Sequence, residues 1–317
     1  MFTTRFENQS FRLPDFIIPG AAKSGTTSLY QMLAQHPSIY FPPSRKEPFY
    51  FSFGGEKPTY TDEKFNELPI WRTSEYLKLY RDAEPDQICG DASTSYLYTA
   101  EKSIKLIREM YGDRYRDLKI IILLRNPIDR AYSHYTYLIR NGFETRSFEE
   151  AISEKGIAEW KSKRWGFDYL AYGAYANQVA AFKNTFPEIK VWLLEDLKNG
   201  NRMISEIFQF LNVSTIDIKR VAKANPSGIP KNRGVVNLLR RNPIIKTIGK
   251  SLPSSMQQSL KGRRDRLMSK FLEKRPMNPE TREKLQRHYR EDITRLQEVI
   301  GRNLEHWLHS VTSSENE

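Results

Sequence analysis

The stretch from Phe16 to Tyr30 constrains the fold more than any other part of this 317-residue chain. A short apolar run between Pro14 and Pro19 predicts a buried strand. Small residues follow, with glycines at 20 and 25, and a helix is expected from Thr26 until Pro37 stops it. A strand, a glycine turn and a helix N-terminus in this order form an anion site, because the turn's N–H groups converge and the helix dipole adds partial positive charge.

The residues inside this turn indicate phosphate as the anion. Lys23 supplies a full positive charge, Gly25 allows the turn, and Ser24, Thr26 and Thr27 supply hydroxyl donors. In the loop of nucleotide triphosphatases the lysine follows the second glycine. Here Lys23 precedes that glycine by two residues, so we predict a phosphate-binding loop that is not of the ATPase type.

A second phosphate-binding group is expected after the clearest strand of the chain, Lys119 to Leu124. This run is apolar on both faces and β-branched, which is typical of a central parallel strand. Arg125 follows the strand, Pro127 is a good helix opener, and Ser133 falls two turns into that helix. A guanidinium and a hydroxyl suit a phosphate, whereas an ATPase would carry an acid where Arg125 stands.

These two motifs resemble those of sulfotransferases that use 3′-phosphoadenosine 5′-phosphosulfate (PAPS). Lys-Ser-Gly-Thr-Thr at 23–27 is similar to the family's 5′-phosphosulfate loop. Arg125 and Ser133, eight positions apart, match the pair that binds the 3′-phosphate. The resemblance, which spans roughly residues 14–235, implies PAPS as cofactor, without a metal. It also assigns Lys231 and Arg233, more loosely, to a late loop that folds over the 3′-phosphate.

The resemblance also implies a catalytic base. In sugar-acting members a Lys-Glu pair followed by aromatics carries it, and Lys46 and Glu47 match that pattern. Glu47 is therefore the predicted base and Lys46 a substrate-binding residue, although a solvated loop carboxylate would look the same. Steroid- and phenol-type members use a histidine base instead; His134 is the rival here, and we expect it to be a packing residue.

A polar turn at residues 91–96 is expected to follow a strand at 87–90. Ligand contacts of α/β proteins gather at such strand ends, and the family has a similar acidic-Ser/Thr-Tyr segment along its acceptor cleft. Asp91 and Ser93 are therefore predicted to contact the acceptor, with ordinary helix capping as the alternative.

The order of strands and helices predicts an α/β fold of the phosphate-loop nucleotide-binding type, with a mostly parallel central sheet flanked by helices. We expect one domain over residues 1–317, with its core at 14–235 and a C-terminal helix at 279–300. Residues 1–13 are expected to be a loose lead-in, and 168–186 one long helix.

The positive charge is concentrated in one segment. Residues 231–275 hold thirteen Lys or Arg and two acids, which accounts for +11 of the formal net charge of +12. Apolar pairs between these cations favour peripheral contact with an anionic membrane; a polyanionic acceptor or a solvated face are the alternatives. A nucleic-acid partner is not expected, because no known reader motif is present.

Cysteine content and hydropathy favour a cytoplasmic protein. The single cysteine, Cys89, allows no internal disulfide, and there is no signal peptide, no apolar run of 18 residues and no metal-ligand cluster.

The predicted function is in-line sulfuryl transfer from PAPS to an acceptor hydroxyl. The resemblance implies a Glu base, as in the members that act on sugars, and this favours a carbohydrate or glycolipid as the acceptor. A small-molecule or polyketide hydroxyl is the alternative acceptor. A phosphate-loop nucleotide kinase is the alternative, although its lysine order differs.

Overall fold

The computed structural model describes residues 1–161, 163–219, 228–230, 272–273 and 275–309. Lys231, Arg233 and nearly all of the basic segment 231–275 lie outside these residues, so the expectations placed on them stay predictions.

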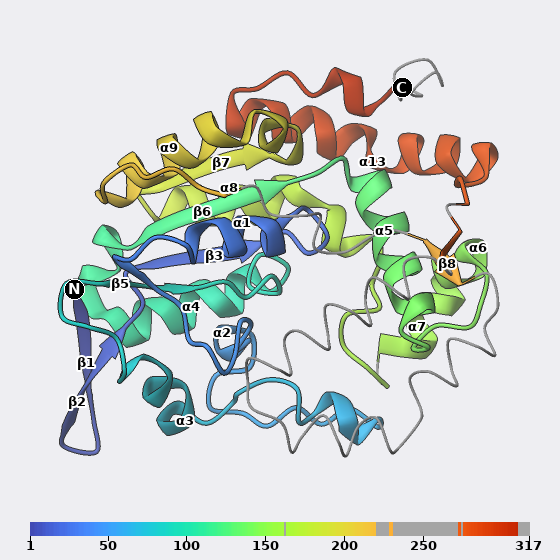
Figure 1. Cartoon of the computed structure of the whole chain (residues 1–317). Coiled ribbons are helices and arrows are strands. Elements are labelled where there is room, and N and C mark those ends of the chain that lie inside the picture. Colours follow the sequence, from blue (N-terminus) through green and yellow to red (C-terminus); the bar gives the residue numbers. More distant parts are fainter. Residues whose placement is uncertain (162, 220–227, 231–271, 274, 310–317) are drawn as a thin grey trace.

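The core of the fold is a five-stranded sheet in which every neighbouring pair of strands is parallel (Figure 1). Its order is β4-β5-β3-β6-β7, and the chain forms its first sheet strand, β3, at the centre. The strands are β3 (Phe16–Gly20), β4 (Ile39–Tyr40), β5 (Ile88–Asp91), β6 (Lys119–Leu124) and β7 (Ile189–Leu193). The predicted α/β class with a central parallel sheet is confirmed.

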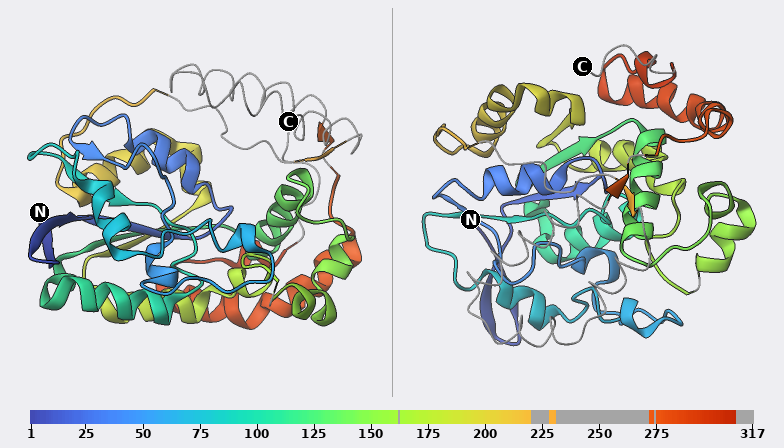
Figure 2. Two further views of the ribbon diagram at one scale, coloured as in Figure 1. Left: turned by 90° about the horizontal axis from the view of Figure 1, so that it is seen from below. Right: turned by 45° about the vertical axis from the view of Figure 1, so that its right-hand side comes forward.

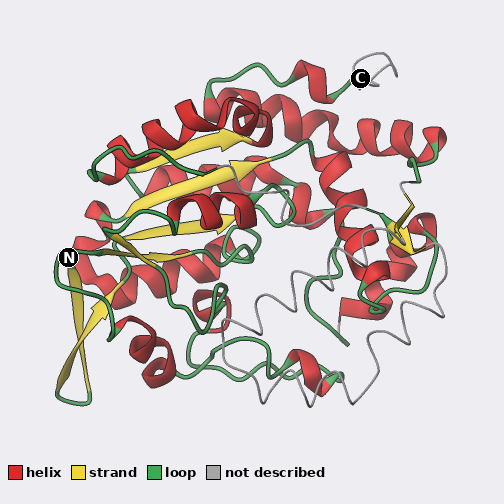
Figure 3. Ribbon diagram, in the orientation of Figure 1, coloured by secondary structure: helices red, strands yellow, loops and turns green. Residues whose placement is uncertain are grey.

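Helices cover both faces of this sheet, because alternate side chains of its central strands are apolar on both sides (Figure 3). In β6, Ile121 and Leu123 pack with α1 (Thr26–Leu33) and α9 (Gly200–Leu211). Ile120 and Ile122 belong to a second core cluster with residues of α4, α5, α8 and α13. These four helices are α4 (Ala100–Tyr111), α5 (Pro127–Arg140), α8 (Tyr175–Thr185) and α13 (Pro279–Ile300).

This arrangement creates a crevice between two neighbouring strands. The chain leaves β3 into α1 on one face of the sheet and leaves β6 into α5, whose apolar residues join the cluster of the other face. Ligands of open parallel sheets bind where the connections diverge in this way, outside the carboxyl ends of the strands. Both predicted phosphate motifs stand at this place.

Two expectations about the flanking segments were wrong. Residues 1–13 form an antiparallel hairpin, β1 (Phe2–Phe6) with β2 (Gln9–Leu13). Its two-residue turn has positive φ at Glu7 and Asn8, 47° and 63°, as a tight hairpin turn that matches the strand twist requires.

The expected helix 168–186 is interrupted. A 3₁₀ turn (Ala171–Gly173) precedes α8, which starts only at Tyr175. Gly173 lies against α13 and the start of α5: a Cβ there would come 2.9 Å from the Tyr289 hydroxyl and 3.0 Å from Pro127 Cβ. This close approach between distant segments interrupts the helical pattern.

Shorter elements complete the described chain (Figure 2). Ser147 and Glu150 form a capping box at the start of α6, where each side chain accepts from the other residue's backbone N–H. None of the described helices is long and apolar enough to cross a membrane. The remaining elements are α2 (Tyr50–Phe53), α3 (Thr73–Leu77), α6 (Phe148–Ala151), α7 (Glu154–Lys161), β8 (Ile229–Pro230), β9 (Leu272–Glu273) and 3₁₀ turns at Glu63–Phe65, Lys78–Tyr80, Gly112–Asp117, Leu194–Asn199 and Glu305–Trp307.

Candidate active site

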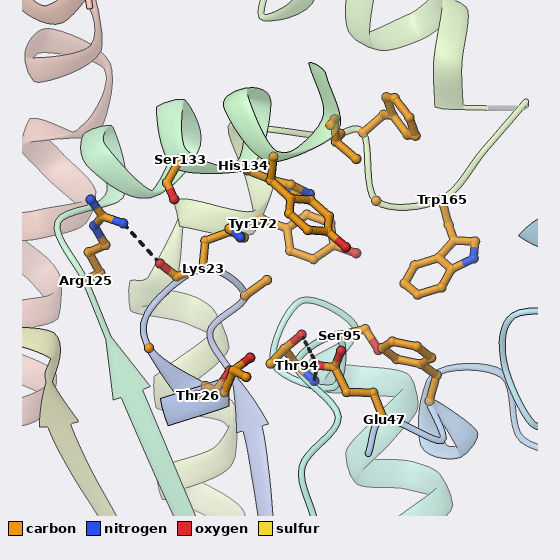
Figure 4. Close-up of a pocket in the computed structure, with 18 of the residues that line it drawn as sticks. Lys23, Thr26, Glu47, Thr94, Ser95, Arg125, Ser133, His134, Trp165 and Tyr172 are labelled. Atoms are coloured by element: carbon orange, nitrogen blue, oxygen red, sulfur yellow. Dashed lines mark hydrogen bonds between the residues drawn. The ribbon is translucent and has the colours of Figure 1, made fainter. Parts of the chain in front are cut away.

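A cavity of about 480 Å³ opens at the carboxyl ends of β3, β5 and β6 (Figure 4). It brings together residues that the sequence analysis had selected from three separate segments. Those lining it are Lys23, Gly25, Thr26, Thr27, Glu47, Arg125 and Ser133. Four other selected residues, Ser24, Lys46, Asp91 and Ser93, are outside the lining that the structure describes.

The loop between β3 and α1 is built to receive an anion. Gly25 has φ 93°, and a Cβ there would lie 2.7 Å from the Leu194 side chain, so a larger residue would not fit. The backbone N–H groups of Gly25, Thr26 and Thr27 have no acceptor among the described residues. These are the unpaired donors of a helix N-terminus. Ser24 is fully buried beside the Tyr175 phenol.

Lys23 occupies the centre of a positive cluster. Burial, followed by the charges of Arg140 and Arg125, lowers the pKa of its amine to about 7, and the Glu47 carboxylate opposes that shift. Its Nζ lies 4.1 Å from the centre of the Tyr137 ring. A buried cation surrounded by other cations is costly for the fold, which is typical of a site prepared for a negatively charged ligand.

Arg125 and Ser133 lie on one side of Lys23 (Figure 4). Arg125 Nη1 donates to the Lys23 carbonyl over 3.3 Å, which ties the end of β6 to the loop after β3. Within the described part of the chain no carboxylate comes within ion-pair distance of Arg125. The guanidinium and the Ser133 hydroxyl line the same cavity, and the phosphate contact that the resemblance implies for them stays a prediction.

Glu47 lies on the other side of Lys23 (Figure 4). Its Oε1 accepts from the Thr94 hydroxyl at 2.8 Å and the Thr94 N–H at 3.4 Å, and Lys46 Nζ is 3.7 Å from the same oxygen. Oε2 has no partner among the residues that the structure describes. One carboxylate oxygen is thus held in place, and the other is available to a ligand.

Lys46 connects the two sides of the cavity. Its Nζ donates to Thr27 Oγ1 over 3.1 Å and approaches Glu47 at the same time. Lys46 therefore fixes the position of the carboxylate relative to the phosphate loop. A direct contact between Lys46 and an acceptor, as predicted from the sequence, stays a prediction.

Asp91 and Ser93 lie behind the cavity wall. Asp91 is buried and accepts from the hydroxyls of Tyr76, Tyr96 and Ser93 at 2.7–3.0 Å. Burial raises its pKa to about 6 in spite of these donors. Ser93 Oγ in turn accepts from the Phe49 N–H. The pair holds the loops that carry Glu47 and Thr94, and its burial does not favour the predicted contact with an acceptor.

His134 lines the cavity, but its hydrogen bonding limits what it can do. Arg130 is completely buried, and its Nη1 lies 3.4 Å from His134 Nδ1. A guanidinium can only donate, so the hydrogen-bond network assigns the lone pair to Nδ1 and the proton to Nε2. Burial and the charges of Arg130 and Lys23 hold the pKa of His134 well below its usual range, so the ring is neutral.

Several cavity residues were not selected from the sequence. Thr94 and Ser95, neighbours of the selected Ser93, line the cavity together with Tyr137 and Trp165. The polar turn at 91–96 was a usable signal for the first two. Trp165 is separated from Glu47 by more than a hundred residues, and no local pattern connects them. Cys89 is buried, and burial raises the pKa of its thiol to about 12.

The residues present fit a nucleotide with phosphate groups. The N–H donors of the loop, an Arg125 without an ion-pair partner among the described residues and the low-pKa amine of Lys23 together favour anionic oxygens. The cavity is also close to the size expected for a small-molecule site.

Comparison with known proteins agrees with this geometry. A family model described as "Sulfotransferase domain" matches residues 13–297. The solved structure of a sulfotransferase from Alicyclobacillus acidocaldarius superimposes with a TM-score of 0.70 and 28% identity, covering 94% of this chain and all of that one.

Curated relatives are similar over part of their length. Heparan sulfate glucosamine 3-O-sulfotransferase 3B1 of Homo sapiens is 25% identical over 201 residues, which is 62% of this chain and 44% of the relative. Carbohydrate sulfotransferase 15 of Mus musculus is 25% identical over 267 residues, 70% of this chain and 47% of the relative. This chain thus spans less than half of these relatives. Since the family model covers most of the chain, the chain belongs to the sulfotransferase domain family.

Proposed function

We propose that this chain transfers a sulfuryl group from PAPS to an acceptor hydroxyl, with Glu47 as the base. The observation that carries the proposal is that Lys23, Arg125 and Glu47, from three loops, line one cavity. This cavity lies at the crevice where the connections after β3 and β6 diverge. When bound, PAPS would supply an activated sulfuryl group. The desulfated nucleotide, with its 5′-phosphate, would be the leaving group. The similar heparan sulfate and carbohydrate enzymes favour a carbohydrate or glycolipid acceptor.

The phosphate side of the cavity would hold the nucleotide. The N–H groups of Gly25, Thr26 and Thr27 would bind the 5′-phosphate, and Arg125 and Ser133 the 3′-phosphate. Two anchors at opposite ends of one molecule fix its orientation, which accelerates a displacement that needs an in-line approach. Ser24, Lys231 and Arg233 are further nucleotide contacts that the resemblance implies.

Glu47 would take the proton of the acceptor. As the acceptor oxygen forms its bond to sulfur, its proton passes to Oε2, the oxygen that no described residue bonds. Thr94 and Lys46 keep the carboxylate oriented during this step. General-base catalysis of this kind contributes on the order of 10²- to 10⁴-fold.

Lys23 would stabilise the leaving phosphate. As the bond between sulfur and the phosphate oxygen breaks, negative charge grows on that oxygen, and a cation fixed beside it is worth more than one in water. The neutral, Nε2-protonated His134 has no lone pair to offer at Nε2, so it suits a hydrogen-bond donor better than a base.

Calorimetry with the desulfated nucleotide, which carries 3′- and 5′-phosphates, tests the donor without a known acceptor. We expect it to bind, and ADP, which lacks the 3′-phosphate, to bind at least about tenfold more weakly because Arg125 loses its partner. Equal affinities would refute the assignment. No observation favours the nucleotide kinase over the sulfotransferase, and phosphate transfer from ATP would reverse that choice.

We also infer a cytoplasmic location with peripheral membrane contact through residues 231–275. The argument rests on the sequence, with cations and apolar pairs interleaved. We expect sedimentation with anionic vesicles that weakens as salt rises. Protein that stays in the supernatant at low salt would exclude this contact.

A further inference from the structure

Aromatic rings gather on the side of the cavity around Glu47. They come from four segments of the chain: Phe49, Phe65, Phe143, and Trp165 with Phe167. Figure 4 shows Trp165 on the same side of the cavity as Glu47, away from Arg125. We call these five residues the aromatic wall.

The aromatic wall is a built surface. Phe49 and Trp165 meet edge to face with ring centres 4.8 Å apart, and Phe65 meets Phe143 and Phe167 at 5.7 and 6.0 Å. The indole N–H of Trp165 donates to the Phe65 carbonyl, so it is already used inside the protein. A ligand on this side therefore meets ring surfaces.

The rim of the cavity is also apolar. The structure gives four large apolar side chains as exposed by more than a third, and three of them line this cavity: Leu68 (41%), Phe143 (40%) and Tyr137 (36%). Exposed apolar side chains that gather at one opening mark a binding site for an apolar ligand. The side chains of Leu68 and Phe143 carry no group that could bind a phosphate.

Positive charge, in contrast, is missing from the aromatic wall as far as the structure describes it. The cations in the cavity lining are Lys23 and Arg125, both on the phosphate side. Arg164 lies next to the wall, but it pairs with Asp62 at 2.7 Å and donates to the Phe143 carbonyl. Among the described residues, a polyanionic sugar chain would find no unpaired cation on this surface, and it would bring its own charges against rings.

We propose that the acceptor hydroxyl is carried by a neutral, apolar body, alkyl or aryl, that rests on the aromatic wall. The inference rests on the proposed sulfuryl transfer and narrows its acceptor. Glu47 would receive the proton of the hydroxyl while Leu68 and Phe143 cover the apolar body at the rim. A glycolipid can present such a body; a sulfated glycan cannot.

A homologous series of n-alkyl β-glucosides tests the proposal, because the sugar hydroxyls stay constant while the apolar body grows. Binding to the protein saturated with desulfated nucleotide is measured by calorimetry, and sulfate transfer from labelled PAPS is measured in parallel. We expect affinity to rise about fourfold per buried methylene until the wall is covered. Phenyl glucoside should bind better than methyl glucoside, and a heparan sulfate oligosaccharide should neither bind nor be sulfated.

Two rim variants locate the effect. Leu68→Ser and Phe143→Ser change exposed side chains, so both should fold, and each should flatten the rise with chain length while leaving affinity for desulfated nucleotide unchanged. Phe11→Ser, in the hairpin β1–β2 and outside the cavity lining, is the matched control and should keep the rise.

The outcomes separate the two proposals. If desulfated nucleotide fails to bind, the proposed function itself is wrong. If it binds but affinity does not change along the alkyl series, or the rim variants keep the full rise, the aromatic wall is not the acceptor site. Sulfation of the heparan sulfate oligosaccharide in preference to the alkyl glucosides would also overturn the inference.

Discussion

Nucleotide binding at pH 8 should be accompanied by proton uptake at Lys23. The amine has a pKa of about 7 in the free protein, so it is about nine-tenths neutral at pH 8. Phosphate oxygens placed beside it favour the charged form and restore its pKa towards the ordinary value. Each nucleotide that binds should then carry about 0.9 proton into the site at pH 8 and about 0.1 at pH 6.

The sign of the pH dependence follows from the same numbers. Below pH 7 the free protein is already charged at Lys23, and binding requires no proton. Above pH 7 each further pH unit should weaken nucleotide affinity about tenfold, until the pKa of the complex is reached. The ligand's own phosphate titrates near pH 6, so measurements at pH 8 isolate the lysine.

Calorimetry in buffers of different ionisation enthalpy measures this uptake directly. The control is Lys23→Arg, whose guanidinium stays charged throughout the range. This variant should bind nucleotide with almost no proton uptake at pH 8. Uptake below about 0.3 in the unaltered protein, or equal uptake in the variant, would show that Lys23 is not the neutral amine inferred here.

Four further substitutions test the other assignments. Arg125→Ala should weaken PAPS and its desulfated product together, on the order of tenfold or more, because both carry the 3′-phosphate; unchanged calorimetric affinities would remove the assignment. Glu47→Gln should lower turnover on the order of 10²-fold or more while the affinity for the nucleotide is kept. His134→Ala is the paired control: if this variant is inactive and Glu47→Gln is active, the histidine is the base. Asp91→Asn should cost about 1–3 kcal/mol of unfolding free energy in urea titrations, since it disturbs three buried hydroxyl donors; no loss would mean that this network is not structural.

Local sequence signals predicted the phosphate side of the site well. β6 was recognised because Lys119–Leu124 is a continuous apolar run, and the start of α5 because Pro127 follows it. Arg125 directly follows β6, and Lys23 stands in the short loop after β3. Parallel strands bring their carboxyl ends together, so a correct reading of the strands was enough to bring both residues to one crevice.

The aromatic wall could not be predicted in the same way. Phe49, Phe143 and Trp165 lie on loops and turns without periodicity, and packing between distant segments decides which way their rings point. The polar turn at 91–96 shows the same limit on a smaller scale. Ser93 was selected, but its hydroxyl donates to the buried Asp91, and its neighbour Thr94 holds Glu47, the proposed base. Turn geometry determines which of two adjacent hydroxyls faces the cavity.

The proposed chemistry depends on keeping two opposite charges close without letting them neutralise each other. The Glu47 carboxylate raises the pKa of Lys23. Burial and the charges of Arg140 and Arg125 lower it, and each of these effects is larger than that of Glu47. Lys46 connects Glu47 to the phosphate loop: its amine approaches Glu47 Oε1 and donates to Thr27 on that loop. Glu47 therefore already has a cationic neighbour, and Lys23 is left for the nucleotide. Through these two contacts Lys46 sets the distance between the proposed base, Glu47, and the loop that would hold the leaving phosphate, before any ligand binds. Stabilisation of charge in a transition state requires groups that are positioned in advance in this way.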